Sequence, residues 1–189
     1  MKYLILIILW LLFCFLHSFL IHPPVENFLK DKFFPKSFYR IFYNLISLFS
    51  FVGAYLYLKI NFSEPKLIII PLWLSTIFII TGILLILWSF SCYNLKEFLG
   101  LAAQNTKNLV KKGPLKYLRH PLYLAALLLI WSESFNLPRL LVNIILSGYI
   151  FIGIKLEEKK LINIFGKEYE SYKKEVPALF PLPHRIFRK

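Results

Sequence analysis

The stretch Gly113–Tyr123, which reads GPLKYLRHPLY, decides how the second half of this chain is organised. A long apolar segment follows it and ends at the charged stretch Leu156–Leu161, LEEKKL. Phe165–Tyr169 (FGKEY) and the Val176–Pro177 pair come next. Ionisable side chains that adjoin segments of membrane length are costly, so a functional role is their default interpretation. The C-terminal half therefore holds the candidate functional site.

The composition indicates a membrane protein. Of the 189 residues, 58% are hydrophobic and 18% aromatic, and the mean hydropathy is +0.61, above the range of soluble domains. We expect one all-α polytopic domain over 1–189, with three spans in 1–90 and the site region in 91–189. The formal charge of +13 falls in loops between apolar runs, so a bilayer explains it better than a nucleic-acid partner. Cys14 and Cys92 lie far apart, which predicts neither a disulfide framework nor a metal site.

The apolar segments predict about five transmembrane helices, since a span needs about 20 residues. The region from 122 to 153 is too long for one helix and is broken by turn-forming residues around Pro138, so it predicts a hairpin. The expected spans are Leu4–Leu20, Phe38–Ile60, Leu67–Phe90, Leu122–Trp131 and Leu140–Gly153.

The positions of the basic residues predict the orientation in the membrane. With five spans, 19 of the 23 lysines and arginines fall on one side, which the positive-inside rule makes cytoplasmic. The site and the C-terminus are then cytoplasmic in a multi-pass protein, which we expect in a bacterial inner membrane. No small-x-small cleavage site follows the first apolar segment, so we expect a span there rather than a signal peptide.

After Gly153 the pattern predicts a separate amphipathic helix at the membrane interface. Its apolar face repeats at steps of three or four residues: Ile154, Glu158, Leu161, Phe165, Tyr169, Tyr172 and Val176. Glu158 is the exception on that face. An acid at an apolar position is a local inconsistency, and such inconsistencies are typical of functional sites.

The candidate site residues supply both charges and an aromatic surface. Arg119 and His120 are hydrogen-bond donors, while Glu157 and Glu158 are acceptors. Pro121 is expected to start a helix at its first position, which leaves exposed backbone N–H groups nearby. Aromatic rings with a polar tip follow at Tyr117, Tyr123 and Tyr169.

Each residue alone also has an ordinary interpretation. An arginine can be a positive-inside anchor, a histidine a helix N-cap, a tyrosine part of an aromatic belt and a glycine a helix C-cap. The acids can pair with lysines on a solvated face, and the candidates are Lys160, Lys155 and Lys111. The joint pattern favours a site over these separate explanations.

Residues 104–181 resemble the isoprenylcysteine carboxyl methyltransferase family of integral-membrane enzymes. The resemblance rests on the order and spacing of RHPxY at Arg119–Tyr123, EExxL at Glu157–Leu161, FGxxYxxY at Phe165–Tyr172 and the Val176–Pro177 pair. It implies a cytoplasmic pocket for S-adenosyl-L-methionine. The positions that match cofactor contacts are Gln104, Leu109, Val110, Leu115, His120, Pro121, Tyr123, Glu157 and Glu158. The resemblance implies no metal.

One departure bears on the acceptor. Isoprenylcysteine enzymes carry an arginine, thought to hold the acceptor's carboxylate, where this chain has Gly153. With this glycine and with motifs such as Leu16–Ser18 (LHS) in its first half, the chain resembles the bacterial methanethiol S-methyltransferase and NnrU-like branch of the family. This resemblance implies a small thiol or other membrane-soluble acceptor. The catalytic roles would then be thiolate stabilisation by Arg119 and proton acceptance by His120 or Tyr123.

Two other functions stay open. An NnrU-like membrane protein with a vestigial pocket would bind a ligand without transferring a methyl group. An isoprenylcysteine or lipid methyltransferase would use the same donor with a larger acceptor. The sequence leaves the oligomeric state open.

Overall fold

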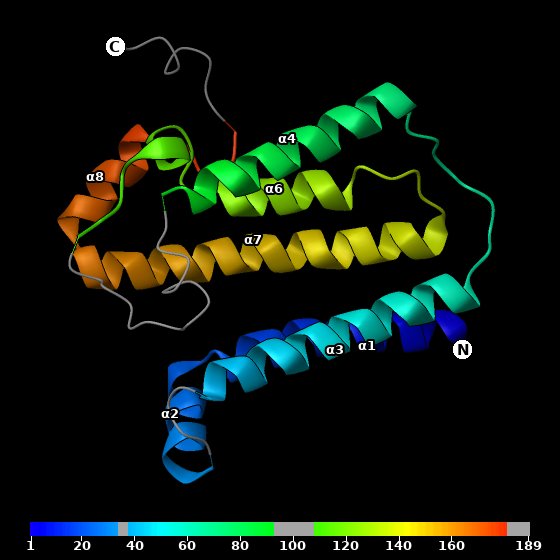
Figure 1. Cartoon of the computed structure of the whole chain (residues 1–189), viewed down its shortest axis with the longest axis horizontal. Helices are drawn as coiled ribbons and strands as arrows, with labels where there is room; N and C mark the ends of the chain where they lie inside the picture. The colour runs from blue at the N-terminus through cyan, green and yellow to red at the C-terminus, as the bar shows by residue number, and fades with distance from the viewer. Residues whose placement is uncertain (34–37, 93–107, 181–189) are drawn as a thin grey trace. The chain divides into compact units, whose positions relative to one another are not determined.

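The described part of the chain is mainly helical (Figure 1). The computed structural model describes residues 1–33, 38–92 and 108–180, and within these ranges the only β pairing is an isolated bridge between Ile68 and Phe135. The elements are α1 (Lys2–Leu20), α2 (Pro23–Lys32), α3 (Phe38–Asn61), α4 (Leu72–Phe90), η1 (Gly113–Lys116), α6 (Pro121–Ile130), α7 (Leu137–Phe165) and α8 (Lys167–Glu175).

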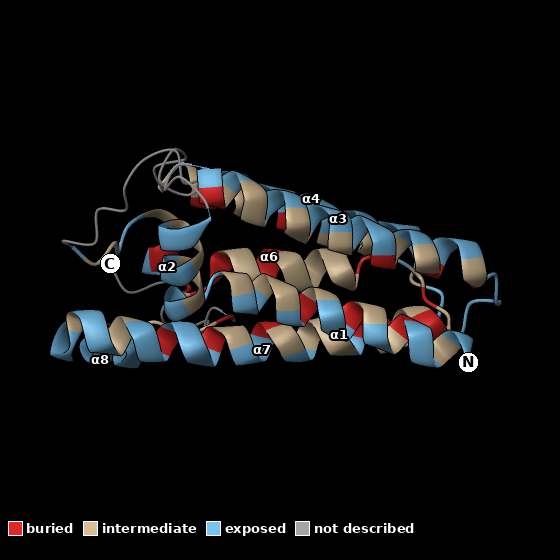
Figure 2. Ribbon diagram, turned by 90° about the horizontal axis from the view of Figure 1, so that it is seen from below, coloured by how far each residue is buried: buried red, intermediate tan, exposed pale blue. Residues whose placement is uncertain are grey.

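The prediction of an all-α polytopic membrane protein is confirmed. Among the described residues, four helices are long and apolar enough to cross a membrane, namely α1, α3, α4 and α7. The helix predicted for the first arm of the hairpin, α6, has 10 residues and is therefore about 15 Å long, half of a bilayer core. Many residues of α1, α3 and α4 are exposed (Figure 2). Their exposed side chains are mostly large and apolar, as lipid contact requires.

The prediction that the last span ends at Gly153 is wrong, because α7 continues without a break from Leu137 to Phe165. A glycine inside a helix costs about 1 kcal/mol but does not end it. The helix ends at Gly166 instead, whose φ of 53° lies in the left-handed region that glycine adopts freely. The Gly166 N–H donates to the Ile162 carbonyl oxygen at 2.8 Å, so Gly166 is the C-cap of α7.

Two further boundaries differ from the sequence pattern. The third span begins at Leu72 rather than Leu67, because the backbone N–H groups of Leu67 and Ile68 donate to the Phe135 carbonyl oxygen and Pro71 is the N-cap. The charged helix α2 was not predicted. It begins with a proline at its first position, and Lys30 and Glu26 form an ion pair one turn apart.

The chain divides into two compact units, and α7 contributes to both. Among the described residues, unit 1 comprises residues 1–33, 38–69 and 134–149, and unit 2 comprises residues 70–92, 108–133 and 150–180. The expectation of a single domain stays a prediction.

In unit 1, α1 packs along α3 (Figure 1). The core of this unit consists of Leu6, Trp10, Ala54, Leu58, Phe62 and Val142. Nearer the other end of α1, the ring of His17 lies 3.2 Å from the Ser47 hydroxyl and 3.0 Å from the Tyr43 hydroxyl. The Ser18 hydroxyl lies 2.9 Å from that of Tyr149 on α7. Such interhelical hydrogen bonds help to hold membrane helices together, because burial of apolar surface gives little driving force for association within a bilayer.

In unit 2, α4 packs along α6 (Figure 1). Gly82 allows this close approach, because a Cβ there would lie 3.1 Å from Leu129 Cγ. The apolar core of the unit consists of Leu118, Leu124, Ile150, Ile154 and Leu179. This core lies at the N-terminal end of α6 and therefore supports the turn that precedes that helix.

Candidate functional site

The Arg119–His120 turn is fixed by its neighbours in the sequence. Pro121 stands at the first position of α6 and His120 is the N-cap, so the helix cannot extend backwards over the turn. The backbone N–H groups of Arg119 and His120 donate instead to the carbonyl oxygens of Pro177 and Ala178, at 2.9 and 3.0 Å. The segment that follows α8 therefore lies against the turn.

Glu158 is the centre of the site. Its Oε1 accepts hydrogen bonds from Arg119 Nε at 2.8 Å and from Arg119 Nη2, and His120 Nε2 lies 3.3 Å from the same oxygen. Its Oε2 lies 2.6 Å from Lys173 Nζ. The side chains of Arg119 and Glu158 are only 8% and 9% exposed. Glu158, the acid that interrupts the apolar face of α7, thus binds both the turn before α6 and Lys173 on α8.

The Arg119 guanidinium is occupied by protein groups on several sides. Besides Glu158, it donates through Nη1 to the carbonyl oxygens of Lys173, at 2.9 Å, and Val176. A guanidinium presents its donors in a rigid planar fork, so these contacts fix the turn relative to the C-terminal end of α8.

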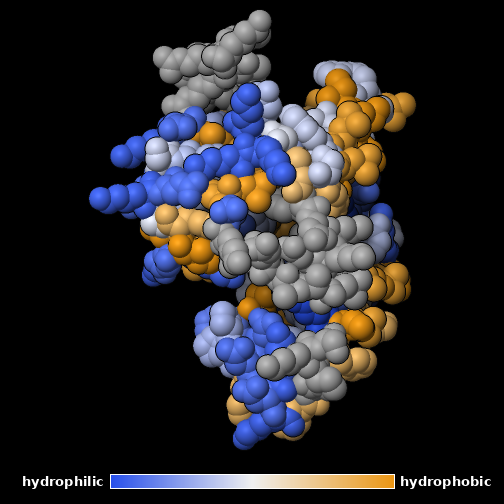
Figure 3. All heavy atoms as spheres, turned by 60° about the vertical axis from the view of Figure 1, so that its left-hand side comes forward, coloured by the Kyte–Doolittle hydropathy of each residue, from blue (hydrophilic) through white to orange (hydrophobic). Residues whose placement is uncertain are grey.

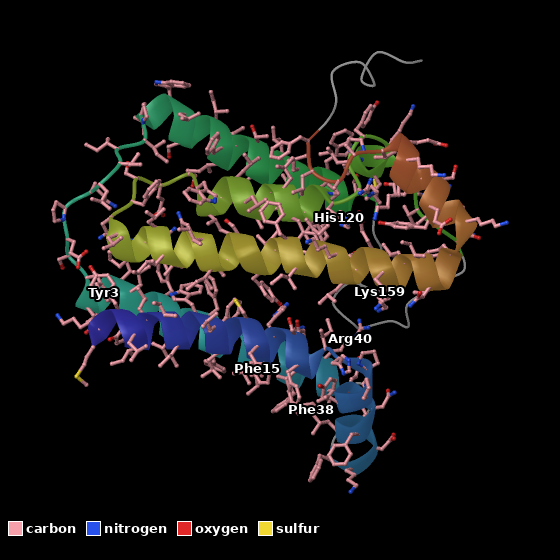
Figure 4. All side chains as sticks on the ribbon, turned by 180° about the vertical axis from the view of Figure 1, so that it is seen from behind. Tyr3, Phe15, Phe38, Arg40, His120 and Lys159 are labelled. Carbon is pink, nitrogen blue, oxygen red and sulfur yellow. The ribbon has the colours of Figure 1, made fainter. Side chains whose placement is uncertain are left out.

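Glu157 differs from its neighbour in exposure. Successive residues of a helix point about 100° apart, and the Glu157 side chain is 44% exposed. Its Oε2 lies 3.9 Å from His120 Nδ1, so the histidine ring lies between the two acids. Figure 4 shows His120 at the start of α6 facing α7, with Lys159 on the other side of the α7 ribbon.

Burial sets the protonation of two side chains near Glu158, namely His120 and Tyr169. Burial lowers the pKa of His120, and the nearby Glu157 and Glu158 carboxylates only partly oppose this. Burial likewise raises the pKa of Tyr169 to about 12, with the Glu158 carboxylate adding to the shift. Both side chains are therefore neutral at pH 7.

Tyr123 reaches across to Gly153. Its hydroxyl oxygen lies 3.5 Å from the position that a Cβ at residue 153 would take. The ring centroids of His120 and Tyr123 are 5.6 Å apart. The glycine thus leaves the α7 backbone open to a tyrosine that carries both an aromatic face and a polar tip.

The other residues predicted to contact the cofactor differ in how far they are buried. Leu115 and Pro121 are buried, whereas Leu109 and Val110 are half-buried in the loop before η1. The Leu115 carbonyl oxygen accepts a hydrogen bond from the Tyr172 hydroxyl at 2.5 Å. Gln104 lies outside the described residues. Among the described residues, no group of three or more His, Cys, Asp or Glu side chains could hold a metal ion.

Sequence reasoning missed Lys173. It stands on α8, which carries several exposed lysines, and hydrophilic side chains gather over this helix (Figure 3). Nothing in the spacing separates Lys173 from Lys167 or Lys174. Only the turn at Gly166, which brings α8 back toward Glu158, selects it. The lysines proposed as partners of the acids are not the ones used, since Lys111 pairs with Glu168 at 2.9 Å.

Comparison with known proteins identifies a family for this chain. Residues 70–168, just over half of the chain, match the family described as phospholipid methyltransferase. Methanethiol S-methyltransferase 1 of Bradyrhizobium diazoefficiens is 42% identical over 73 residues, which are 37% of this chain and 26% of the relative. Methanethiol S-methyltransferase 2 of the same organism is 26% identical over 97% of this chain and 73% of the relative.

The match extends to a eukaryotic protein, the protein-S-isoprenylcysteine O-methyltransferase of Schizosaccharomyces pombe. It is 34% identical over 80 residues, 39% of this chain and 33% of the relative. The alignments with the first relatives span 26% of their length. No solved structure matches. The family match includes α4, α6, α7 and the Arg119–Glu158 cluster, and the chain therefore belongs to the phospholipid methyltransferase family.

Proposed function

We propose that this chain is an integral-membrane methyltransferase that uses S-adenosyl-L-methionine. One observation carries the proposal beyond family membership. The Arg119–His120 turn and the Glu157–Glu158 pair, remote in sequence, meet within unit 2 at distances of 2.8 to 3.9 Å. The site thereby combines carboxylates, an imidazole and aromatic rings beside apolar helices.

The residues present suit this donor. When bound, S-adenosyl-L-methionine supplies an electrophilic methyl group on a sulfonium, and its leaving group is a neutral thioether. The donor also carries hydroxyls and an ammonium, which need carboxylate acceptors such as Glu157 and Glu158. Tyr123 and the half-buried Leu109 and Val110 offer aromatic and apolar surface for its adenine ring.

His120 is placed to accept a proton. A carboxylate only accepts hydrogen bonds, so the contact with Glu158 puts the imidazole proton on Nε2 and leaves Nδ1 as the basic nitrogen. The lowered pKa keeps His120 neutral at pH 7 and able to take the proton of an acceptor thiol at Nδ1. Orientation and exclusion of water would supply much of the remaining rate.

We assign Arg119 a positioning role rather than direct contact with the acceptor thiolate. Its guanidinium is engaged by Glu158 and by two backbone carbonyl oxygens, and its side chain is 8% exposed. Arg119 then acts through Glu158 and His120, whose orientation it fixes.

The proposed acceptor is a small thiol or another membrane-soluble molecule. Support comes from the relatives named methanethiol S-methyltransferase and from Gly153, which has no side chain to bind an acceptor carboxylate. The similarity to an isoprenylcysteine O-methyltransferase keeps a prenylated acceptor as the second candidate. The distribution of basic residues supports a cytoplasmic position for the site.

The test measures donor binding and transfer. Purified protein in detergent should bind S-adenosylhomocysteine with a micromolar Kd and transfer a labelled methyl group to one member of a panel of thiols and prenylcysteines. His120→Ala should reduce turnover at least about 100-fold. Lys159→Ala, on the other side of α7, is the matched control and should leave turnover within about twofold.

The outcomes separate the alternatives. Binding without transfer to any acceptor would favour the NnrU-like non-enzymatic function. Absence of binding by protein that unfolds cooperatively on heating would refute the proposal.

A further inference from the structure

Resting on the proposed function, we propose that Lys173 occupies the place on Glu158 that the donor's ammonium group takes, and that donor binding displaces it. The Lys173 ammonium lies 2.6 Å from Glu158 Oε2, while Arg119 and His120 share Oε1. A lysine side chain and the amino-acid end of the donor both present a primary ammonium. Lys173 is therefore an internal competitor for the donor.

Of the cations on Glu158, Lys173 is the one that can leave. The Arg119 side chain is 8% exposed and hydrogen-bonded on several sides, so its release would leave a buried charge. The Lys173 side chain is 45% exposed and can exchange the carboxylate for water. The half-exposed ammonium regains water when it leaves, so its release costs less than that of the buried guanidinium.

The backbone at Lys173 does not need to move. Its carbonyl oxygen accepts a hydrogen bond from Arg119 Nη1 at 2.9 Å. The neighbouring Tyr172 hydroxyl is bonded to the Leu115 carbonyl oxygen at 2.5 Å. With α8 held at both points, only the long, flexible lysine side chain has to rotate away, and Glu158 keeps its orientation through Arg119.

Competition of this kind lowers the apparent affinity for the donor. When only a fraction of the protein is binding-competent, the apparent Kd rises by the inverse of that fraction. If the lysine lies on Glu158 about 70–90% of the time, affinity is weakened about three- to tenfold. With Lys173 on Oε2, the donor's ammonium would lie a few ångströms from a like charge that repels it, so the two groups compete for this oxygen.

The test compares Lys173→Met with the native chain in detergent, using calorimetry to measure Kd for two ligands. S-adenosylhomocysteine carries the ammonium, and 5′-methylthioadenosine lacks the amino-acid portion altogether. Lys173→Met should bind S-adenosylhomocysteine about three- to tenfold more tightly and leave the affinity for 5′-methylthioadenosine unchanged. Lys167→Met, on the same helix, is the matched control and should alter neither affinity.

Each other outcome overturns the proposal. Unchanged or weaker binding of S-adenosylhomocysteine by Lys173→Met would show that Lys173 does not compete. Equal tightening of both ligands would show that the lysine only obstructs the site. If the native chain binds neither ligand, both the proposed function and this inference are refuted. If Lys173→Met does not fold, Lys173→Gln carries the same expectations.

Discussion

The two adjacent acids should differ sharply in their contribution to stability. Glu158→Ala removes one partner of an ion pair whose side chains are 8% and 9% exposed. Breaking a buried pair in this way costs about 3–5 kcal/mol, because the remaining charge is left uncompensated. Arg119 keeps two backbone carbonyl acceptors, so we expect the lower end of that range. Glu157, which is 44% exposed, should cost less than about 0.5 kcal/mol when replaced by alanine.

The effect is large enough to measure by thermal unfolding. For a chain of this size, 1 kcal/mol shifts Tm by about 2–4 °C, so Glu158→Ala should lower Tm by about 6–12 °C. Tryptophan fluorescence in one detergent, at one protein concentration, gives the comparison. Arg119→Met combined with Glu158→Met should recover much of the loss, because no buried charge then remains unpaired. Equal losses from Glu157→Ala and Glu158→Ala would refute the assignment of Glu158 as the buried centre.

Three further predictions concern the turn and its supports. Burial lowers the pKa of His120, so the folded protein binds fewer protons than the unfolded chain just below pH 6.5. The stability that neutral His120 contributes should be fully present above about pH 6.5 and should be lost as the pH falls through the folded-state pKa. Thermal unfolding at pH 7.5, 6 and 5 would measure this loss, which should be smaller for His120→Gln. Gly113→Ala should lower the free energy of unfolding by about 1–3 kcal/mol, because φ is 59° there and the new Cβ would clash with Cys92 Sγ. Adding Cys92→Ala should remove the clash but not the backbone strain. Tyr172→Phe leaves the Leu115 carbonyl oxygen without its buried donor and should cost about 1–3 kcal/mol by the same measurement.

Each of these three predictions can be contradicted by a specific measurement. Stability that rises on acidification between pH 6.5 and 5 would contradict the histidine prediction. Full rescue of Gly113→Ala by Cys92→Ala would show that the left-handed backbone contributes nothing. Tyr117→Phe, on the exposed end of η1, is the control for Tyr172→Phe and should leave Tm unchanged.

Much of the fold could be predicted because its signals are local. About 20 consecutive, predominantly apolar residues predict a span wherever they occur, and α1 and α4 are such helices of 19 residues each. Pro121 at the first position of α6 and Gly166 after α7 are equally local, because each residue restricts or permits particular backbone angles. The prediction of a helix end at Gly153 failed because the change from apolar to charged residues there does not end a helix, and a helix tolerates a single glycine.

The site was only partly predictable because its partners are chosen by tertiary contact. Glu158 stood out as an acid on an apolar face, but its partner could have been any nearby lysine. The structure selects Arg119, 39 residues away, and Lys173 on the next helix. It also agrees with the sequence pattern in burying Glu158 and leaving the neighbouring Glu157 side chain 44% exposed.

The sequence by itself determined the membrane-spanning helices, the turn before α6 and the types of side chain available for chemistry, because these depend on residue composition and backbone angles over a few residues. The tertiary structure alone decided which cations Glu158 binds, namely Arg119 and Lys173. The physical reason is that a charge in a low-dielectric interior requires a partner in direct contact, and that contact exists only once α6, α7 and α8 have packed.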